Sequence, residues 1–170
     1  STLPANLDGT WGDDVWASVQ AGAVSETFFG KDGNDDLNGM GGDDVLSGGL
    51  GDDTLTGGTG ADDLLGGLGN DTYIYNAGDG LDVLADTGGV DEILFGAGIT
   101  SGGVTVIDDG AFDTRIVLNS GSDEILIIGQ RDPDTAFQIE SLRFDDGTVI
   151  DFIGGPDAGD AIDGTAGDDR

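Results

Sequence analysis

The 170-residue sequence contains no cysteine and no histidine, and only five of its residues are basic. The two missing residue types exclude disulfides, thiol nucleophiles, imidazole general bases and the usual zinc ligand sets. Lys31 is the only basic residue before Arg115, so no basic patch is available for nucleic acid or an anionic lipid surface. No apolar run is long enough to span a bilayer, and no signal peptide is recognisable. We therefore expect neither nucleic-acid binding nor membrane insertion.

Acidic residues are abundant by contrast: 35 of them give a net charge of −30. Nearly all are aspartate, whose short side chain favours turns, whereas glutamate is the better helix former. Because thiolate and imidazole ligands are absent, oxygen is the main metal-binding chemistry available, and oxygen ligands select hard cations such as Ca²⁺. This composition alone is typical of disorder, so a fold requires a stronger signal than composition.

That signal is a nine-residue period, Gly-Gly-x-Gly-x-Asp-x-apolar-x, which runs without insertion or deletion from Gly30 to Ile74. The glycines permit tight turns, the sixth-place aspartate supplies a hard oxygen ligand, and the eighth-place residue points into the core of a short strand. Decayed copies flank the clean ones at residues 9–17, 21–29, 77–85 and 86–94. A fixed short period predicts a solenoid. The eighth-place residues form the predicted core ladder: Trp16, Phe28, Leu37, Leu46, Leu55, Leu64, Tyr73, Leu84 and Ile93.

The repeat resembles the calcium-binding nonapeptide of RTX proteins. The resemblance implies an all-β, right-handed parallel β-roll in which loops eighteen residues apart stack on one edge and bind several Ca²⁺ ions between them. It implies side-chain ligands at Asp35, Asp44, Asp53, Asp62 and Asp71. It implies carbonyl ligands at Gly33, Gly42, Gly49, Gly51, Gly58, Gly60, Gly67 and Gly69. Asp14, Asp82 and Asp91 also occupy the sixth place, but register breaks leave their stacking partners open, and Glu26 departs from the pattern.

Beyond about Gly96 the period ends and ordinary strand signals replace it, at residues 104–107, 115–118, 124–128, 138–144 and 148–152. This tail resembles the β-rich domain that follows the repeats in haemolysin-type calcium-binding proteins. We expect four segments: a lead-in with one outlying repeat (1–20), the β-roll (21–94), an antiparallel β-rich capping domain (95–155), and a linker with the start of a further repeat (156–170). The last segment echoes residues 7–14, which indicates either tandem modules in a larger parent or a common way to begin such a block.

Without a cation the sixth-place carboxylates would repel one another, so metal binding should be coupled to folding. RTX proteins leave Gram-negative bacteria unfolded through a type I channel. The resemblance therefore implies a secreted module, not an enzyme, that folds on extracellular Ca²⁺ and stabilises the neighbouring domains of a larger protein. The alternative is a Ca²⁺-rigidified adhesion module that contacts a polysaccharide or cell surface. Trp11 is the candidate contact for that alternative, although we expect it to cover the open end of the roll. We interpret Asp132-Pro133 as a polar turn, with self-cleavage as the alternative.

Overall fold

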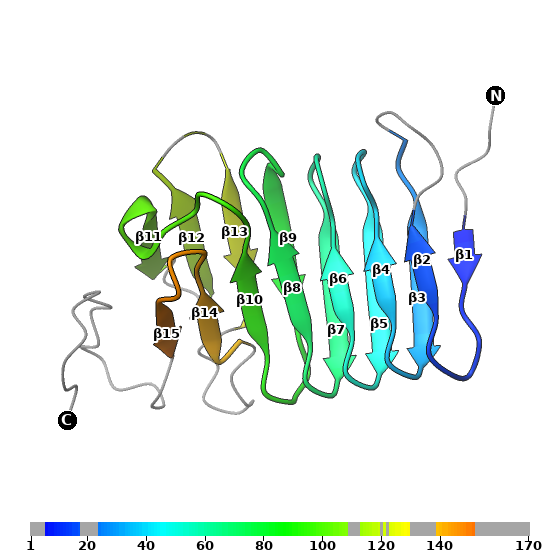
Figure 1. The fold of residues 1–170 in the computed structure, drawn as a ribbon. Coiled ribbons are helices and arrows are strands. Elements are labelled where there is room, and N and C mark those ends of the chain that lie inside the picture. The colour runs from blue at the N-terminus through cyan, green and yellow to red at the C-terminus, as the bar shows by residue number, and fades with distance from the viewer. Residues whose placement is uncertain are drawn as a thin grey trace.

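The computed structural model describes residues 6–17, 24–108, 113–119, 121, 123–129 and 139–151 (Figure 1). These residues form two long sheets, and their helical structure is limited to one 3₁₀ turn, η1 (Ser101–Gly103). The strands alternate between the two sheets along the repeat region, as expected when each nine-residue copy supplies one short strand. The chain is thus a parallel β-solenoid, and the predicted β-roll is confirmed.

The eight-stranded sheet contains, in spatial order, β1 (Asn6–Asp8), β3 (Thr27–Asp32), β5 (Val45–Leu50), β7 (Asp63–Leu68), β9 (Leu81–Ala85), β13 (Glu124–Ile127), β12 (Thr114–Leu118) and β11 (Val104–Asp108). The seven-stranded sheet contains β15 (Val149–Asp151), β14 (Ser141–Arg143), β10 (Glu92–Phe95), β8 (Thr72–Tyr75), β6 (Thr54–Thr56), β4 (Asp36–Asn38) and β2 (Val15–Ala17). All pairs from β1 to β9 and from β2 to β10 are parallel.

The core consists of two ladders of eighth-place residues, one on each sheet. In the eight-stranded sheet, Phe28, Leu46, Leu64 and Leu84 are in register with one another, and in the other sheet Leu37, Leu55, Tyr73 and Ile93 are. All eight are buried, and Trp16 packs against them partly exposed at the end of the roll. The predicted ladder is therefore confirmed. Trp11 does not cover that end: it is 81% exposed, so our expectation for it was wrong.

The loops between the strands depend on glycines with positive φ. All eight glycines predicted as carbonyl ligands have this conformation, with φ values from 96° at Gly58 to 153° at Gly60. An L-residue with a side chain adopts this region only at a cost. Two loops nevertheless carry a side chain at positive φ in the second place of the repeat, at Lys31 (89°) and Met40 (67°). The glycines therefore set the turn geometry that brings successive loops into contact.

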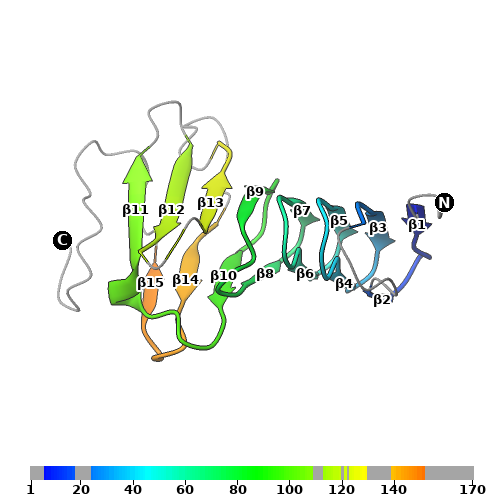
Figure 2. The same cartoon turned by 90° about the horizontal axis from the view of Figure 1, so that it is seen from above.

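The C-terminal strands extend both sheets of the roll. Strand β13 pairs in parallel with β9, and β12 and β11 follow it antiparallel; β14 pairs in parallel with β10, and β15 follows it antiparallel. Figure 2 shows the two sheets facing each other along the whole length. The core is continuous as well, because Phe95 from β10 stacks on Phe144 at a ring-centroid distance of 4.9 Å. The expected antiparallel strands are present, joined to the roll through one parallel pair in each sheet.

Some sequence predictions fall outside the described residues. These are the interpretation of Asp132-Pro133 and the linker with a further repeat at 156–170. The division of the chain into four segments stays a prediction.

Candidate metal centre

The residues that precede the strands of the seven-stranded sheet form a continuous row of carboxylates, the first carboxylate column. Its members are Asp14, Asp35, Asp53, Asp71, Asp91 and Glu140. Each backbone N–H in this row donates a hydrogen bond to a carboxylate oxygen of the next member. The N···O distances are 2.7 Å from Asp14 to Asp35 and 2.8 Å from Asp35 to Asp53 and from Asp53 to Asp71. The same bond measures 2.7 Å from Asp71 to Asp91 and 2.6 Å from Asp91 to Glu140.

A second carboxylate column lies on the opposite edge, where the strands of the eight-stranded sheet begin: Glu26, Asp44 and Asp62 precede their strands, and Asp82 is the second residue of β9. The N–H of Glu26 donates to Asp44 Oδ1 (2.7 Å), that of Asp44 to Asp62 Oδ1 (2.8 Å), and that of Asp62 to Asp82 Oδ1 (3.1 Å). The spacing is 18 residues for the first two pairs and 20 for the third, because Tyr75 and Asn76 lengthen one turn. Glu26 therefore stands in the column like an aspartate, and Asp82 stacks on Asp62.

This arrangement fixes one oxygen of each carboxylate and leaves the other for a different partner. The Oδ2 atoms of Asp35, Asp44, Asp53, Asp62, Asp71 and Asp91 are buried without a hydrogen-bond partner, as is Oε2 of Glu26. A buried carboxylate oxygen without a partner costs free energy unless a cation binds it. The donor set is all oxygen, so the residues present fit Ca²⁺, which takes about six to eight oxygen ligands.

Asp14 differs from the other predicted ligands because it lies in the last described turn at the open end of the roll. Its Oδ2 accepts the Thr10 N–H at 2.6 Å, and its side chain is only partly buried. Thr10 thus occupies the oxygen that is unpartnered in the inner members. Of all the predicted side-chain ligands, Asp14 fits a cation least well.

The glycines of the loops place backbone oxygens in the same gaps between turns. A Cβ on Gly51 would fall on the carbonyl oxygen of Gly33, and a Cβ on Gly69 would fall on that of Gly51. Carbonyls at alternate places of one loop are therefore directed at the next loop, and their role as cation ligands stays a prediction. The Gly60 carbonyl already accepts the Leu81 N–H (3.2 Å), and because a carbonyl has two lone pairs, one remains for a cation. The Gly67 carbonyl accepts both the Thr87 N–H (3.2 Å) and Thr87 Oγ1 (2.6 Å), so both of its lone pairs are used.

Burial changes the acidity of these carboxyl groups. Removal from water raises the pKa of Asp53 and Asp62 from the usual 3.8 to about 6, and that of Asp71 and Asp82 to about 7. The pKa of Asp91 is raised too, for the same reason. In each case the backbone N–H bond lowers the pKa and neighbouring carboxylates raise it, but desolvation is the largest cause. The metal-free fold therefore favours the protonated acids.

We predict that the calcium-free chain gains β-structure on acidification. An acid whose pKa is higher in the folded than in the unfolded chain makes folding more favourable as pH falls between the two values. For Asp53, Asp62, Asp71 and Asp82 this window extends from about pH 4 to about pH 7. Far-UV circular dichroism in EDTA across the window measures the effect. β-Structure that is constant or falls on acidification would contradict it.

The first column ends on a carboxylate from the C-terminal strands, Glu140, which the sequence did not single out and which precedes β14 as the sixth-place aspartates precede their strands. Asp123 precedes β13, but the register of β13 with β9 places Ile125 beside Asp82, so Asp123 does not continue the second column. Asp123 Oδ2 accepts the Gly78 N–H at 2.7 Å. A third acid that sequence reasoning missed, Asp86, stands in the first place of its repeat, where the clean copies have glycine. That deviation was the only available signal.

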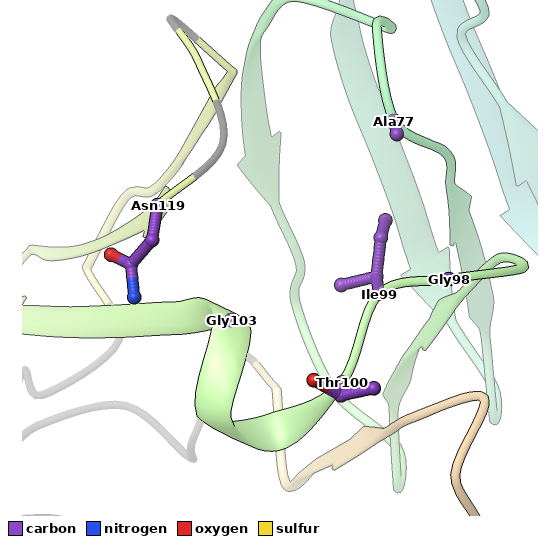
Figure 3. Close-up of a pocket in the computed structure, with 6 residues that line it drawn as sticks. All are labelled: Ala77, Gly98, Ile99, Thr100, Gly103 and Asn119. Carbon is purple, nitrogen blue, oxygen red and sulfur yellow. The ribbon is translucent and has the colours of Figure 1, made fainter.

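A hollow also lies beside the joint between the roll and the C-terminal strands, lined by Ala77, Gly98, Ile99, Thr100, Gly103 and Asn119 (Figure 3). Ile99 points toward Ala77 in this view, and Asn119 approaches from β12. None of the lining residues is ionisable, so the hollow offers no acid–base group and no charged metal ligand.

Two columns of half-satisfied carboxylates on the edges of a parallel β-solenoid define a calcium-binding β-roll module. The family comparison agrees: residues 20–55 and 41–73 match the family model described as RTX calcium-binding nonapeptide repeat (4 copies). This stretch of the chain consists of RTX repeats, and the repeats bind Ca²⁺. The search of curated proteins returned no match. Among the described residues, no helix combines the length and apolar character needed to cross a bilayer.

Proposed function

We propose that this module folds when its repeats bind extracellular Ca²⁺, and that it then stabilises the neighbouring domains of a larger secreted protein. The observation that carries the proposal is the set of buried, unpartnered carboxylate oxygens in the two columns. At neutral pH these groups repel one another across the loops, and the short strands of the roll offer little to offset that repulsion. The same groups become cation ligands when Ca²⁺ is present, so the binding free energy becomes folding free energy.

The proposal assigns the sixth-place aspartates and Glu26 as side-chain ligands, and the loop glycines other than Gly67 as carbonyl ligands. Calcium modules outside cells typically have dissociation constants of about 10⁻⁴ to 10⁻³ M, far above cytosolic Ca²⁺. A chain with that affinity stays unfolded inside the cell and folds outside it. This behaviour suits export through a type I channel, which requires an unfolded chain.

Limited proteolysis with three cation conditions tests this function. We expect residues 24–95 to resist cleavage in millimolar Ca²⁺ and to be cut rapidly in EDTA. Equimolar Mg²⁺ should not protect them, because Mg²⁺ demands a small octahedral shell and gives up its waters reluctantly. Cleavage at equal rates in all three conditions would contradict the proposal. Protection by Mg²⁺ would show that the repeats do not select Ca²⁺ over Mg²⁺.

A second candidate function is supported by the exposed aromatic ring of Trp11. The backbone of Trp11 is held by an isolated parallel β-bridge to Asp32. On a Ca²⁺-rigidified surface this ring could stack against the apolar face of a sugar. Screening the loaded module on a glycan array, with Trp11→Ala as the control, separates this adhesion function from the purely stabilising one.

A further inference from the structure

The last turn of the first carboxylate column differs from the turns before it. Its loop begins with Asp86, whereas the five clean repeats all begin with glycine. The Asp86 carboxylate lies over Gly66: a Cβ on Gly66 would contact Asp86 Oδ2 as well as Asp71 Oδ2. At the equivalent Gly48, one turn earlier, a Cβ would meet a single carboxylate, that of Asp53. An additional negative charge has therefore been placed in this gap between turns.

Tyr73 holds Asp86 in that position. It replaces the leucine found in the eighth place of the other four clean repeats. Its hydroxyl donates a 2.5 Å hydrogen bond to Asp86 Oδ2 and accepts the Gly66 N–H at 2.8 Å. Asp86 Oδ1 in turn accepts the Gly88 N–H at 2.9 Å. Two deviations from the repeat, an aspartate for glycine and a tyrosine for leucine, thus depend on each other.

Three carboxylates meet in this gap. Asp71, Asp86 and Asp91 are all buried, and each contributes an oxygen that lies within 4.8 Å of the others. The Oδ2 atoms of Asp71 and Asp91 have no hydrogen-bond partner, although these residues are only 1% and 0% exposed. Three carboxylates at this separation repel one another strongly when they are ionised in a partly desolvated site, and a cation bound between them removes that repulsion.

The C-terminal strands close the gap on its far side. Glu140 Oε2 accepts the Asp91 N–H at 2.6 Å, and the Glu140 N–H donates to the Asp91 carbonyl at 2.9 Å. Glu140 thereby takes the place that the next sixth-place aspartate would occupy, although it is 49 residues from Asp91 in sequence. The nearby cation Arg143 is paired with Glu92 at 3.0 Å.

We propose that Asp71, Asp86 and Asp91, closed by Glu140, form the last calcium site of the first carboxylate column, the junction site, in which Asp86 is an extra ligand that the other repeat sites lack. The junction site binds Ca²⁺ more tightly than they do and joins the roll to the C-terminal strands. The inference rests on the proposed function, because it concerns one site within the same calcium-dependent fold. The affinity of a calcium site rises with the number of charged ligands, and this site has three or four carboxylates where a repeat site has two. Ca²⁺ is favoured because all the ligands are hard oxygens.

Release of bound Ca²⁺ into excess chelator, measured on the full chain loaded and folded at saturating Ca²⁺, tests the site. We expect the native chain to retain one ion about tenfold longer than the others. Asp86→Gly restores the repeat consensus and should show no such retained ion, while still folding at high Ca²⁺ by circular dichroism. Glu140→Gln keeps an acceptor for the Asp91 N–H but removes the charge, and should lower the retained calcium in the same direction. Asp63→Asn, an exposed carboxylate on β7, is the matched control for charge and should retain the ion.

No retained ion in the native chain, or equal retention by Asp86→Gly and Asp63→Asn, would overturn the junction site. Either result leaves the proposed function intact as long as the native chain still folds at high Ca²⁺. Failure of the native chain to fold in Ca²⁺ would instead contradict the proposed function. The two hypotheses are therefore tested separately by the same samples.

Discussion

Gly51→Ala should destabilise the calcium-loaded module by at least about 2 kcal/mol. Gly51 is in the fourth place of its repeat with a φ of 126°, a conformation that alanine adopts only at a cost. A Cβ at this position would also overlap the Gly33 carbonyl oxygen in the adjacent turn. Because backbone is packed against backbone, neither side can rotate away. The two turns must separate, and the ligand atoms in the gap between them separate as well.

Gly78→Ala is the matched control for this experiment. Gly78 also has a positive φ, of 95°, but no atom lies within 4 Å of the position that its Cβ would take. Urea unfolding of both variants in saturating Ca²⁺ measures the difference directly. Equal losses of stability would show that stacking of the turns does not set the cost.

Asp53→Asn should have opposite effects on the two states of the chain. With Ca²⁺ present, the amide cannot replace the anionic Oδ2, so the folding midpoint should rise about tenfold or more in Ca²⁺ concentration. Without Ca²⁺ at neutral pH, the same substitution removes the charge of a buried carboxyl group whose pKa is raised to about 6. The metal-free folded state of Asp53→Asn should therefore be more stable than that of the native chain. The amide oxygen still accepts the Asp35 N–H, which keeps the loop geometry.

Calcium titrations of the native chain and Asp53→Asn measure the effect on the calcium-loaded fold. Circular dichroism of both chains in EDTA, from about pH 4 to pH 7, measures the effect on the metal-free fold. Asp36→Asn, which removes an exposed carboxylate at the start of β4, controls for the change in net charge. A purely structural aspartate would lose stability on substitution in both states. That result would contradict the ligand role of Asp53.

The nine-residue period was sufficient to predict the fold and most of the candidate site. It fixes which residues face the core, as at Leu55, and which carboxylates stack, as at Asp35 and Asp53. Local sequence is enough here because each turn contacts only its neighbours. The position of Trp11 in its repeat explains why our expectation for it was wrong. Trp11 is in the third place, where side chains point outward, and Leu50 and Leu68 in the same place are about half exposed.

The period could not predict features that depend on the C-terminal strands. Glu140 joins the first carboxylate column because β14 pairs with β10, a contact between segments about fifty residues apart. Asp86 looked like a decayed glycine, and its role becomes visible only once Tyr73 and Asp91 are placed beside it. The stacking partners of Asp82 and Asp91 required the length of the turn at Tyr75 and Asn76, which sequence alone leaves open.

The central claim is that calcium binding and folding of the roll are one event. A calcium titration of the EDTA-stripped chain, followed by far-UV circular dichroism, tests it most directly. We predict a steep, cooperative transition from coil to β-structure at about millimolar Ca²⁺, with little response to Mg²⁺. A spectrum that is already β-rich in EDTA at neutral pH, and that does not change as Ca²⁺ is added, would contradict the account.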